Sequence, residues 1–188
     1  MIHLILGRQG SGKTLFLVKK AYEYYKQGKN IYSNVALKFP YKKLDYNDII
    51  NCKLNNGVVI LDEIHLLLPA RNSNRIINRE ICDNFLSMVR KKGLIIFGTT
   101  QTERKVDIRF REEKDFLYYC DKFAYIKNQW CQIMHNQNLD KKIKIMIKLK
   151  VQEMFSLNIT DIFFIGNEYF EMFDTTQIIK IKNIKLKK

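Results

Sequence analysis

The stretch MIHLILGRQGSGKTLF (residues 1–16) changes character twice within a few positions. The apolar run over 2–6 predicts a buried strand, and the periodic apolar residues after Gly12 predict a helix. The glycine-rich segment between them fits the pattern Gly-x4-Gly-Lys-[Ser/Thr]. The matching residues are Gly7, Gly12, Lys13 and Thr14. Because the pattern follows a strand and opens a helix, it predicts a P-loop rather than a chance glycine-rich turn.

A P-loop binds the phosphates of a nucleotide with its backbone. Its glycines let the N–H groups turn inward onto phosphate oxygens, and the positive end of the following helix assists. Lys13 is expected to bridge the β- and γ-phosphates, and the Thr14 hydroxyl to bind Mg²⁺. The predicted nucleotide-binding residues are Gly7, Arg8, Gln9, Gly10, Ser11, Gly12, Lys13 and Thr14.

The length and the net charge of the chain indicate how many domains it has and which partners it favours. The 188 residues suit one domain, 1–188, and 33 Lys and Arg against 19 Asp and Glu give a net charge of +14. Such a field favours polyanions, either nucleic acid or an anionic membrane surface. The alternative is a chain that uses lysine for solvated faces.

Cysteine spacing argues against a zinc-binding protein, and hydropathy argues against a protein that spans a membrane. The four cysteines, at 52, 82, 120 and 131, have no CxxC spacing and no paired histidine, which argues against a zinc site. Scattered thiols and the lack of a secretory leader indicate a reducing cytosol. No apolar run approaches the roughly 18 residues of a membrane span.

Strand and helix signals alternate over about residues 1–115. Apolar runs at 29–35, 57–63 and 94–101 predict further strands. Helices are predicted from Gly12 to about Gln27, ending at Gly28, around 45–51, and over 78–93. This alternation predicts an α/β fold with a mostly parallel sheet flanked by helices and right-handed crossovers.

After about residue 115 the pattern becomes β-rich. In KKIKIMIKLKVQ (141–152) apolar residues from Ile143 to Val151 alternate with lysines, which predicts a half-buried strand with a charged outer face. Gly166-Asn167 between two apolar runs predicts a hairpin. We expect 116–188 to add antiparallel strands to the edge of the sheet, with a lysine-rich tail.

Two carboxylates follow the buried strand VVIL. Asp62 stands at the end of that strand, where it can hold Mg²⁺ through water, and Glu63 is placed to polarise an attacking water. The alternative is a charged pair that merely leaves the sheet edge. Beside a P-loop, the pair favours hydrolysis.

The strand at 94–101 ends in Gln101, which can reach the γ-phosphate or the attacking water if it is not simply the first loop residue. Beyond it come Arg104, Arg109 and Arg111. Arginine neutralises charge on a transferring phosphoryl group and can come from a neighbouring subunit, although these three could equally be solvated or paired with Glu112 and Glu113.

The loop 70–80 holds arginines at 71, 75 and 79, which suit sequence-independent phosphate contacts or an ordinary solvated surface. His65 could orient the loop after Glu63 or pack without a special role. Trp130 and the tyrosines at 22, 24 and 25 could stack bases, but their spacing favours core packing.

With these motifs placed, the sequence resembles the HerA–FtsK superfamily of additional-strand, RecA-like P-loop ATPases. It is most similar in pattern to viral genome-packaging ATPases, those of archaeal viruses especially, and to Zot-like phage assembly ATPases. The resemblance lies in LILGRQGSGKT, NIYSNV, VVILDEIHLLLPARNS, KKGLIIFGTTQ, VDIRFRE and EMFDTTQII. It covers about residues 1–115 well and the rest weakly, and the chain lacks both the transmembrane helix of Zot proteins and the extra domains of cellular pumps.

The resemblance implies roles for individual residues. Lys13 and Thr14 would hold ATP and Mg²⁺, Asp62 the Mg²⁺, and Glu63 would be the catalytic base. Gln101 would be the sensor, and Arg109 the arginine finger acting in trans, with Arg111 as runner-up. The resemblance also implies a homo-oligomeric ring, with a hexamer as the favoured state.

Three functions remain open at this stage. The first is an ATP-hydrolysing motor that packages double-stranded DNA into a preformed viral capsid, working in the host cytoplasm and transiently at the capsid vertex. The second is a Zot-like virion assembly or export ATPase with a protein or membrane partner. The third is a P-loop small-molecule kinase, which the Asp62–Glu63 pair and Gln101 disfavour because they point to hydrolysis.

Overall fold

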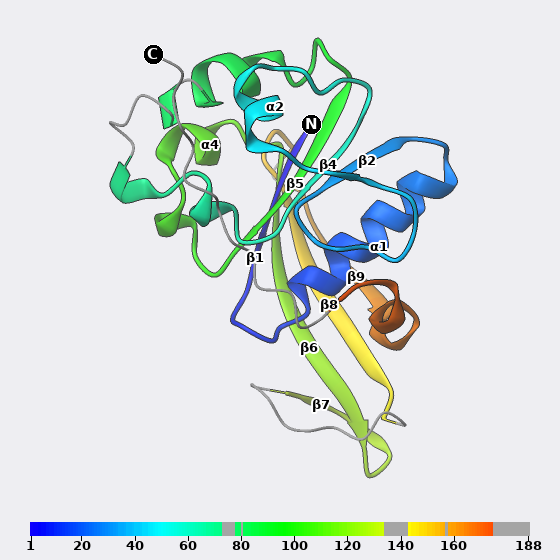
Figure 1. Ribbon diagram of the computed structural model, residues 1–188. Coiled ribbons are helices and arrows are strands. Elements are labelled where there is room, and N and C mark those ends of the chain that lie inside the picture. The colour runs from blue at the N-terminus through cyan, green and yellow to red at the C-terminus, as the bar shows by residue number, and fades with distance from the viewer. Residues whose placement is uncertain (73–77, 80, 134–142, 157, 175–188) are drawn as a thin grey trace.

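A single mixed sheet runs through the protein (Figure 1). The computed structural model describes residues 1–72, 78–79, 81–133, 143–156 and 158–174. Within them the strand order is β3-β2-β4-β5-β1-β6-β8-β9, and β7 pairs with β6. The strands are β1 Ile2–Leu6, β2 Asn30–Ser33, β3 Lys42–Lys43, β4 Gly57–Leu61, β5 Leu94–Thr100, β6 Phe116–Ile126, β7 Gln129–Gln132, β8 Ile145–Glu153 and β9 Ile159–Ile165.

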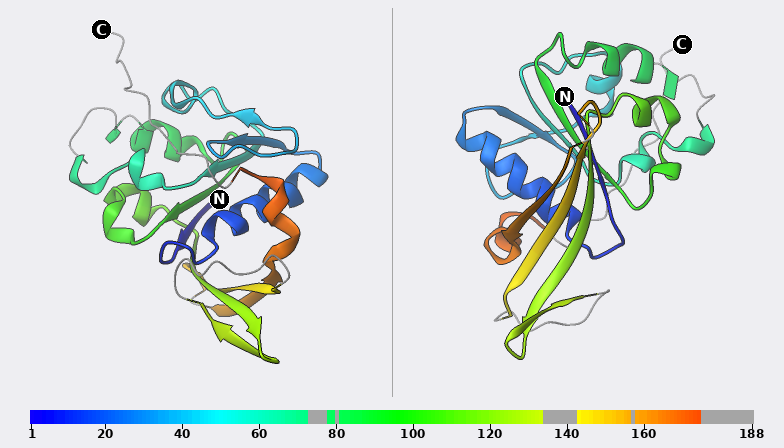
Figure 2. Two further views of the ribbon diagram at one scale, coloured as in Figure 1. Left: turned by 60° about the horizontal axis from the view of Figure 1, so that its bottom comes forward. Right: turned by 180° about the vertical axis from the view of Figure 1, so that it is seen from behind.

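Helices cover both faces of the parallel part of the sheet (Figures 1 and 2). The α-helices are α1 Lys13–Lys26, α2 Tyr46–Ile50 and α4 Ile108–Glu112, and η3 Ile81–Leu86 is a π-helix. The 3₁₀ segments are η1 Ile64–Leu66, η2 Ala70–Asn72, η4 Glu103–Lys105 and η5 Gly166–Met172. None of the helices in the described residues is long and apolar enough to cross a bilayer.

The parallel strands carry the core. β1 lies between β5 and β6 and is parallel to both, and β4 is parallel to β2 and β5. Every residue of β1 and of β4 is buried, as expected for strands with both faces covered. Phe16 of α1 belongs to the cluster on one face, and Phe85 and Phe110 belong to the cluster on the other. The predicted α/β class is confirmed.

The helix predicted over 78–93 differs in its geometry. Residues 81–86 are π-helical and residues 87–88 return to α-helix. The Ser87 hydroxyl donates hydrogen bonds to the carbonyls of Asp83 and Asn84, which competes with the regular backbone pairing there. The predicted inward residues Ile81, Phe85 and Val89 are nevertheless buried.

The β-rich extension adds antiparallel strands to the sheet, as predicted. β8 pairs antiparallel with β6, and β9 pairs antiparallel with β8. The alternate apolar residues from Ile145 to Val151 are buried in β8, whereas Lys142 and the tail from 175 lie outside the described residues. β6 joins the two parts because its residues 116–119 pair in parallel with β1. Beyond them, β6, β7 and β8 form an arm that extends past the parallel strands (Figures 1 and 2).

The hairpin predicted at Gly166-Asn167 is wrong. The chain reverses earlier, between the end of β8 at Glu153 and the start of β9 at Ile159, and Gly166 begins η5. Neither Gly166 nor Asn167 has the positive φ that a two-residue hairpin turn requires. The Asn167 side chain instead accepts a hydrogen bond from Ile145 N (2.7 Å) and donates one to Ile143 O (2.9 Å). It thereby fixes η5 to the start of β8.

Candidate nucleotide-binding site

The loop between β1 and α1 has the backbone of a phosphate cradle. Gly12 has φ +97°, and a Cβ built there would lie 2.3 Å from Ile147 Cδ1. A Cβ on Gly7 would lie 2.7 Å from the carbonyl oxygen of Cys120. Only glycine fits at these two positions, since any side chain would collide with β6 or β8. The loop leads directly into the N-terminus of α1, and the free N–H groups at such an end favour anions.

The polar side chains of the loop suit a phosphate. Lys13 is buried, 6% exposed, and its Nζ donates to Gly7 O at 2.9 Å and Arg8 O at 3.1 Å. The ammonium is therefore held at the mouth of the loop. Ser11 Oγ is buried and has no hydrogen-bond partner among the described residues. A buried hydroxyl without a partner and an inward-held ammonium fit a ligand rich in oxygen acceptors.

Thr14 and Asp62, which are 48 positions apart, meet at the carboxyl edge of the sheet. Thr14 Oγ1 donates to Asp62 Oδ2 at 3.0 Å, and Thr99 Oγ1 donates to Asp62 Oδ1 at 2.5 Å. Asn34 fixes the Asp62 backbone through two hydrogen bonds, of 2.8 and 2.9 Å. A hydroxyl and a carboxylate in contact are the oxygen ligands that Mg²⁺ prefers, so these residues fit that ion.

Glu63 follows β4 in an unusual backbone conformation. Its φ is +52°, uncommon for a residue with a side chain, and its N–H donates to Thr99 Oγ1 at 2.9 Å. Its Oε2 lies 3.1 Å from Nδ1 of His65. Burial lowers the pKa of His65, with Glu63 opposing that shift. The left-handed turn, held by Thr99, aims the carboxylate along the sheet edge toward His65; such conformations recur at functional sites.

Gln101 stands immediately after β5, at the same edge as Asp62 and Glu63. Its Oε1 accepts a hydrogen bond from Lys105 Nζ at 2.9 Å. The sequence placed Gln101 correctly at the strand end. Its contact with a γ-phosphate or an attacking water stays a prediction.

Arg109 has a partner within its own chain. Its Nε donates to Asp107 Oδ1 and its Nη2 donates to Asp107 Oδ2, each at 3.1 Å. Asp107 is fully buried. Arg109 Nη1 lies 3.6 Å from Asp83 Oδ1. Burial alone would raise the pKa of Asp107, but the hydrogen bonds from Arg109 and Asn78 outweigh it and lower that pKa. Arg109 therefore stabilises the start of α4, and its action in trans stays a prediction, as does that of Arg111. Glu112 and Glu113, the predicted alternative partners, are not the ones that hold Arg109.

Sequence reasoning missed the residues that support Asp62. Asn34 and Thr99 lie at the carboxyl ends of neighbouring strands, and their place in YSNV and GTTQ was the available signal.

Of the loop arginines, Arg71 and Arg79 are exposed, and Arg75 lies outside the described residues. His135 is also outside them.

Comparison with known proteins supports the predicted relationships. The model of a family described as zonular occludens toxin (Zot) matches residues 41–158. The N-terminal domain of zonular occludens toxin from Neisseria meningitidis is similar in structure, with TM-score 0.63, 19% identity, and coverage of 92% of this chain and 98% of that one. No curated protein sequence matches this chain significantly.

Two further structures share the fold. The genome packaging NTPase B204 from Sulfolobus turreted icosahedral virus 2, in complex with ATP-gammaS, has TM-score 0.56 and 13% identity, covering 85% of this chain and 95% of that one. The ATPase domain of G40P has TM-score 0.52 and 12% identity, covering 86% and 80%. The predicted P-loop NTPase fold is thereby confirmed.

Proposed function

The chain belongs to the Zot family, whose model matches more than half of its length, and from this premise we propose that it is an ATP-hydrolysing motor of a virus. The observation that carries the proposal is the contact of Thr14 Oγ1 with Asp62 Oδ2, 3.0 Å long, with Glu63 next in the chain. Together they supply a metal-binding pair and a base at one sheet edge. The packaging NTPase and the ATPase domain that share the fold support the same class of reaction.

The reaction is the transfer of the γ-phosphoryl group of ATP to water. The P-loop N–H groups and Lys13 hold the phosphates. Thr14 and Asp62 would hold Mg²⁺, which would supply positive charge beside the phosphate oxygens. Glu63 accepts a proton from water as the water oxygen bonds to the γ-phosphorus and the bond to ADP breaks. Gln101 orients that water. An arginine from a neighbouring subunit of a ring stabilises the charge that develops on the phosphoryl oxygens.

We propose double-stranded DNA as the load of this motor, with genome packaging in the host cytoplasm as its task. The net charge of +14 supports this, because a basic surface binds the phosphate backbone whatever its sequence. Arg71 and Arg79 are exposed and follow, along the chain, the strand that carries Asp62. Their contact with DNA would carry no base specificity.

The second candidate is an assembly or export ATPase that acts with a protein or membrane partner. The family match favours it, as does the likeness to the toxin's N-terminal domain over nearly the whole of that structure. β9 also presents exposed apolar residues, Phe163 among them, on an outer strand of the sheet. A small-molecule kinase is less well supported, because the Asp62–Glu63 pair and Gln101 favour hydrolysis.

DNA-dependent turnover separates the two candidates. ATP hydrolysis should rise when double-stranded DNA is added at low salt, and the stimulation should disappear as salt is raised. Heparin serves as a polyanion control and should stimulate less. The double variant Arg71→Ala/Arg79→Ala should lose more stimulation than Lys38→Ala/Lys43→Ala, which removes two exposed cations elsewhere. Turnover that ignores DNA would reject the DNA load in favour of the protein or membrane partner.

A further inference from the structure

The His65 imidazole lies against the carboxylate of Glu63, two positions earlier in the chain. Its Nδ1 is 3.1 Å from Glu63 Oε2 and 3.3 Å from Thr100 Oγ1, at the end of β5. Glu63 Oε2 is buried, and no hydrogen bond from elsewhere in the described residues reaches it. The imidazole is therefore the polar group that faces the buried oxygen of the proposed base, although the reaction proposed for Glu63 gives His65 no part.

The surroundings of His65 favour the tautomer that suits a carboxylate. The Thr100 hydroxyl donates its hydrogen to Thr102 O at 3.3 Å, so its oxygen is left to accept a hydrogen bond from Nδ1 of His65. Nδ1 then carries the proton, and the same N–H faces Glu63 Oε2. Burial lowers the pKa of His65, which favours the neutral ring with this single N–H.

The fold fixes where both side chains begin. His65 lies in η1, and its neighbour Ile64 is buried in the core. A Cβ on Gly98 of β5 would lie 3.0 Å from Ile64 Cδ1, so this turn packs directly on the strand. The N–H of Glu63 donates to Thr99 Oγ1 of the same strand at 2.9 Å. Both partners of the contact are therefore anchored to the end of β5.

We infer that His65 is a positioning residue for Glu63. The inference rests on the proposed function and adds a residue that acts through the base. His65 holds Oε2, so that Glu63 presents Oε1 to the attacking water. Contacts of this kind often align fully only when substrate is bound. Because a displacement of about 1 Å can cost about 10²-fold in rate, the contact matters for kcat and not for ATP binding.

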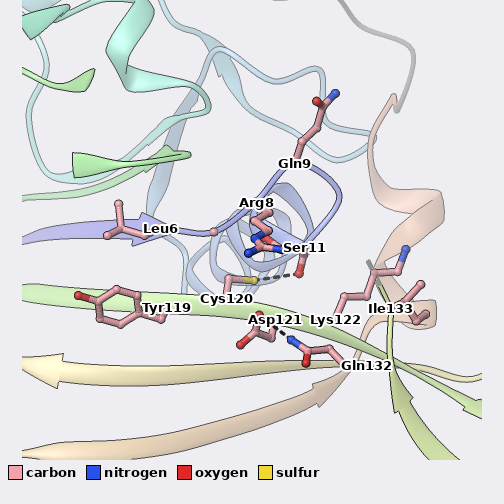
Figure 3. A pocket seen from close by; sticks show the side chains of 11 residues that line it. Leu6, Arg8, Gln9, Ser11, Tyr119, Cys120, Asp121, Lys122, Gln132 and Ile133 are labelled. Carbon is pink, nitrogen blue, oxygen red and sulfur yellow. Dashed lines mark hydrogen bonds between the residues drawn. The ribbon is translucent and has the colours of Figure 1, made fainter. Parts of the chain in front are cut away.

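A further carboxylate, Asp121 of β6, borders the P-loop without such an arrangement. Gln132 Nε2 donates to Asp121 Oδ1 at 3.2 Å, at the side of a pocket of about 310 Å³ that Arg8 and Lys122 also line (Figure 3). Asp121 is exposed, whereas Oε2 of Glu63 is buried. In the sheet, β6 and β4 lie on opposite sides of β1. Of these two carboxylates, only Glu63 stands beside the metal-binding pair with an imidazole against it.

The test measures kcat and ATP affinity of His65 variants of the full chain with Mg²⁺. His65→Leu should lower kcat by about 10–100-fold, while the Kd for ATP from titration calorimetry stays within about threefold of wild type. His65→Asn places an amide nitrogen near the position of Nδ1 and should keep kcat within about threefold of wild type. His65→Gln carries its amide one bond further out and should not. Leu66→Asn, at a neighbouring side chain that is 43% exposed, is the control and should keep kcat.

The double variant Glu63→Gln/His65→Leu separates positioning from a merely structural role. Once the base is removed, His65→Leu should lower kcat no further, whereas a structural loss would add to the first. Nitrogen-15 NMR of the protein without ATP gives a reading independent of turnover. Of the charged groups that act on His65, Glu63 raises its pKa, and Lys105 and Lys13 lower it. Glu63→Gln should therefore lower the pKa of His65 further.

Wild-type kcat in His65→Leu, beside lost turnover in Glu63→Gln, would overturn the inference and leave the proposed function standing. Additive losses in the double variant, or an unchanged pKa of His65 in Glu63→Gln, would also overturn it. If His65→Leu does not fold, the two amide variants decide, and equal kcat values for His65→Asn and His65→Gln would count against positioning. Wild-type turnover by Glu63→Gln is a different result, because the proposed base then fails together with the inference.

Discussion

Arg109→Ala distinguishes a structural arginine from a catalytic one. Arg109 donates two hydrogen bonds of 3.1 Å to Asp107, whose carboxylate is fully buried between α4 and the rest of the chain. Removing one partner of a buried ion pair costs about 3–5 kcal/mol, because the remaining charge is left uncompensated. Arg109 is 28% exposed, and Asn78 and the Arg109 N–H continue to donate to Asp107. We therefore expect the free energy of unfolding to fall by about 2–3 kcal/mol.

The pH dependence of this loss follows from Asp107. Its pKa lies below the usual 3.8 in the folded wild type, so its contribution to stability is present above pH 3.8 and is lost as the pH falls through the lowered value. The variant lacks the hydrogen bonds from the Arg109 side chain, so the pKa of Asp107 should lie above its wild-type value, and the folded variant should bind a proton at a higher pH than the wild type does. The difference in stability should therefore be largest near pH 7 and shrink as the pH falls toward 3.

Thermal unfolding followed by circular dichroism measures this difference. A loss of about 2–3 kcal/mol lowers the Tm of a chain of this size by roughly 4–12 °C. Arg104→Ala removes an exposed arginine from the neighbouring η4 segment and should change stability by less than about 0.5 kcal/mol. If Arg109→Ala keeps the wild-type Tm but abolishes ATP turnover, the structural reasoning is refuted and Arg109 is the finger in trans.

Three further predictions concern His3, Gly12 and Asn167. Burial, aided by the nearby N-terminal ammonium, lowers the pKa of His3 to about 3, so the unfolded chain binds its proton first and wild-type stability should fall as the pH drops below 6.5. This one group can change the free energy of unfolding by at most about 1.4 kcal/mol per pH unit. We expect that part of the pH dependence to be absent in His3→Phe when its urea unfolding is compared at pH 6.5 and pH 4.5. Gly12→Ala forces a Cβ to within 2.3 Å of Ile147 Cδ1 at φ +97°, so ATP binding measured by calorimetry should be lost; unchanged affinity would mean that the loop relaxes freely. Asn167→Ala removes the bonds to Ile145 N and Ile143 O and should cost about 1–3 kcal/mol in urea unfolding. Asn55→Ala, at an exposed asparagine of the loop before β4, should cost less than about 0.5 kcal/mol.

Local sequence patterns were enough to predict most of the parallel core. The apolar runs of β1, β4 and β5 are as short as strands buried on both faces, and the glycine pattern between β1 and α1 has few alternatives. The P-loop pattern therefore placed Thr14 at the start of α1, where it lies, and its role as a ligand of Mg²⁺ stays a prediction. The approach of Asp62 to Thr14 followed because parallel strands bring their carboxyl ends to one edge of a sheet.

Contacts that no local sequence pattern encodes were harder to predict. Gly166-Asn167 has the composition of a turn, but the hydrogen bonds of Asn167 to β8 decided its conformation. Asp107 and Arg109 are two positions apart, and nothing local shows that the carboxylate is buried and binds the guanidinium. The sharing of one edge of β6 by β1 and β7 depends on a register that no single segment encodes.

ATP binding and turnover of Glu63→Gln test the hydrolysis claim most directly. The substitution keeps the size of the side chain and removes the base, so Mg²⁺-dependent ATP binding should stay within about threefold of wild type, while turnover falls by roughly 10²–10⁴-fold. Glu112→Gln, an exposed carboxylate on α4, is the matched control and should hydrolyse ATP at the wild-type rate. Wild-type turnover by Glu63→Gln, or a wild type that binds ATP with Mg²⁺ and never hydrolyses it, would contradict the assignment of Glu63 as the base of an ATPase.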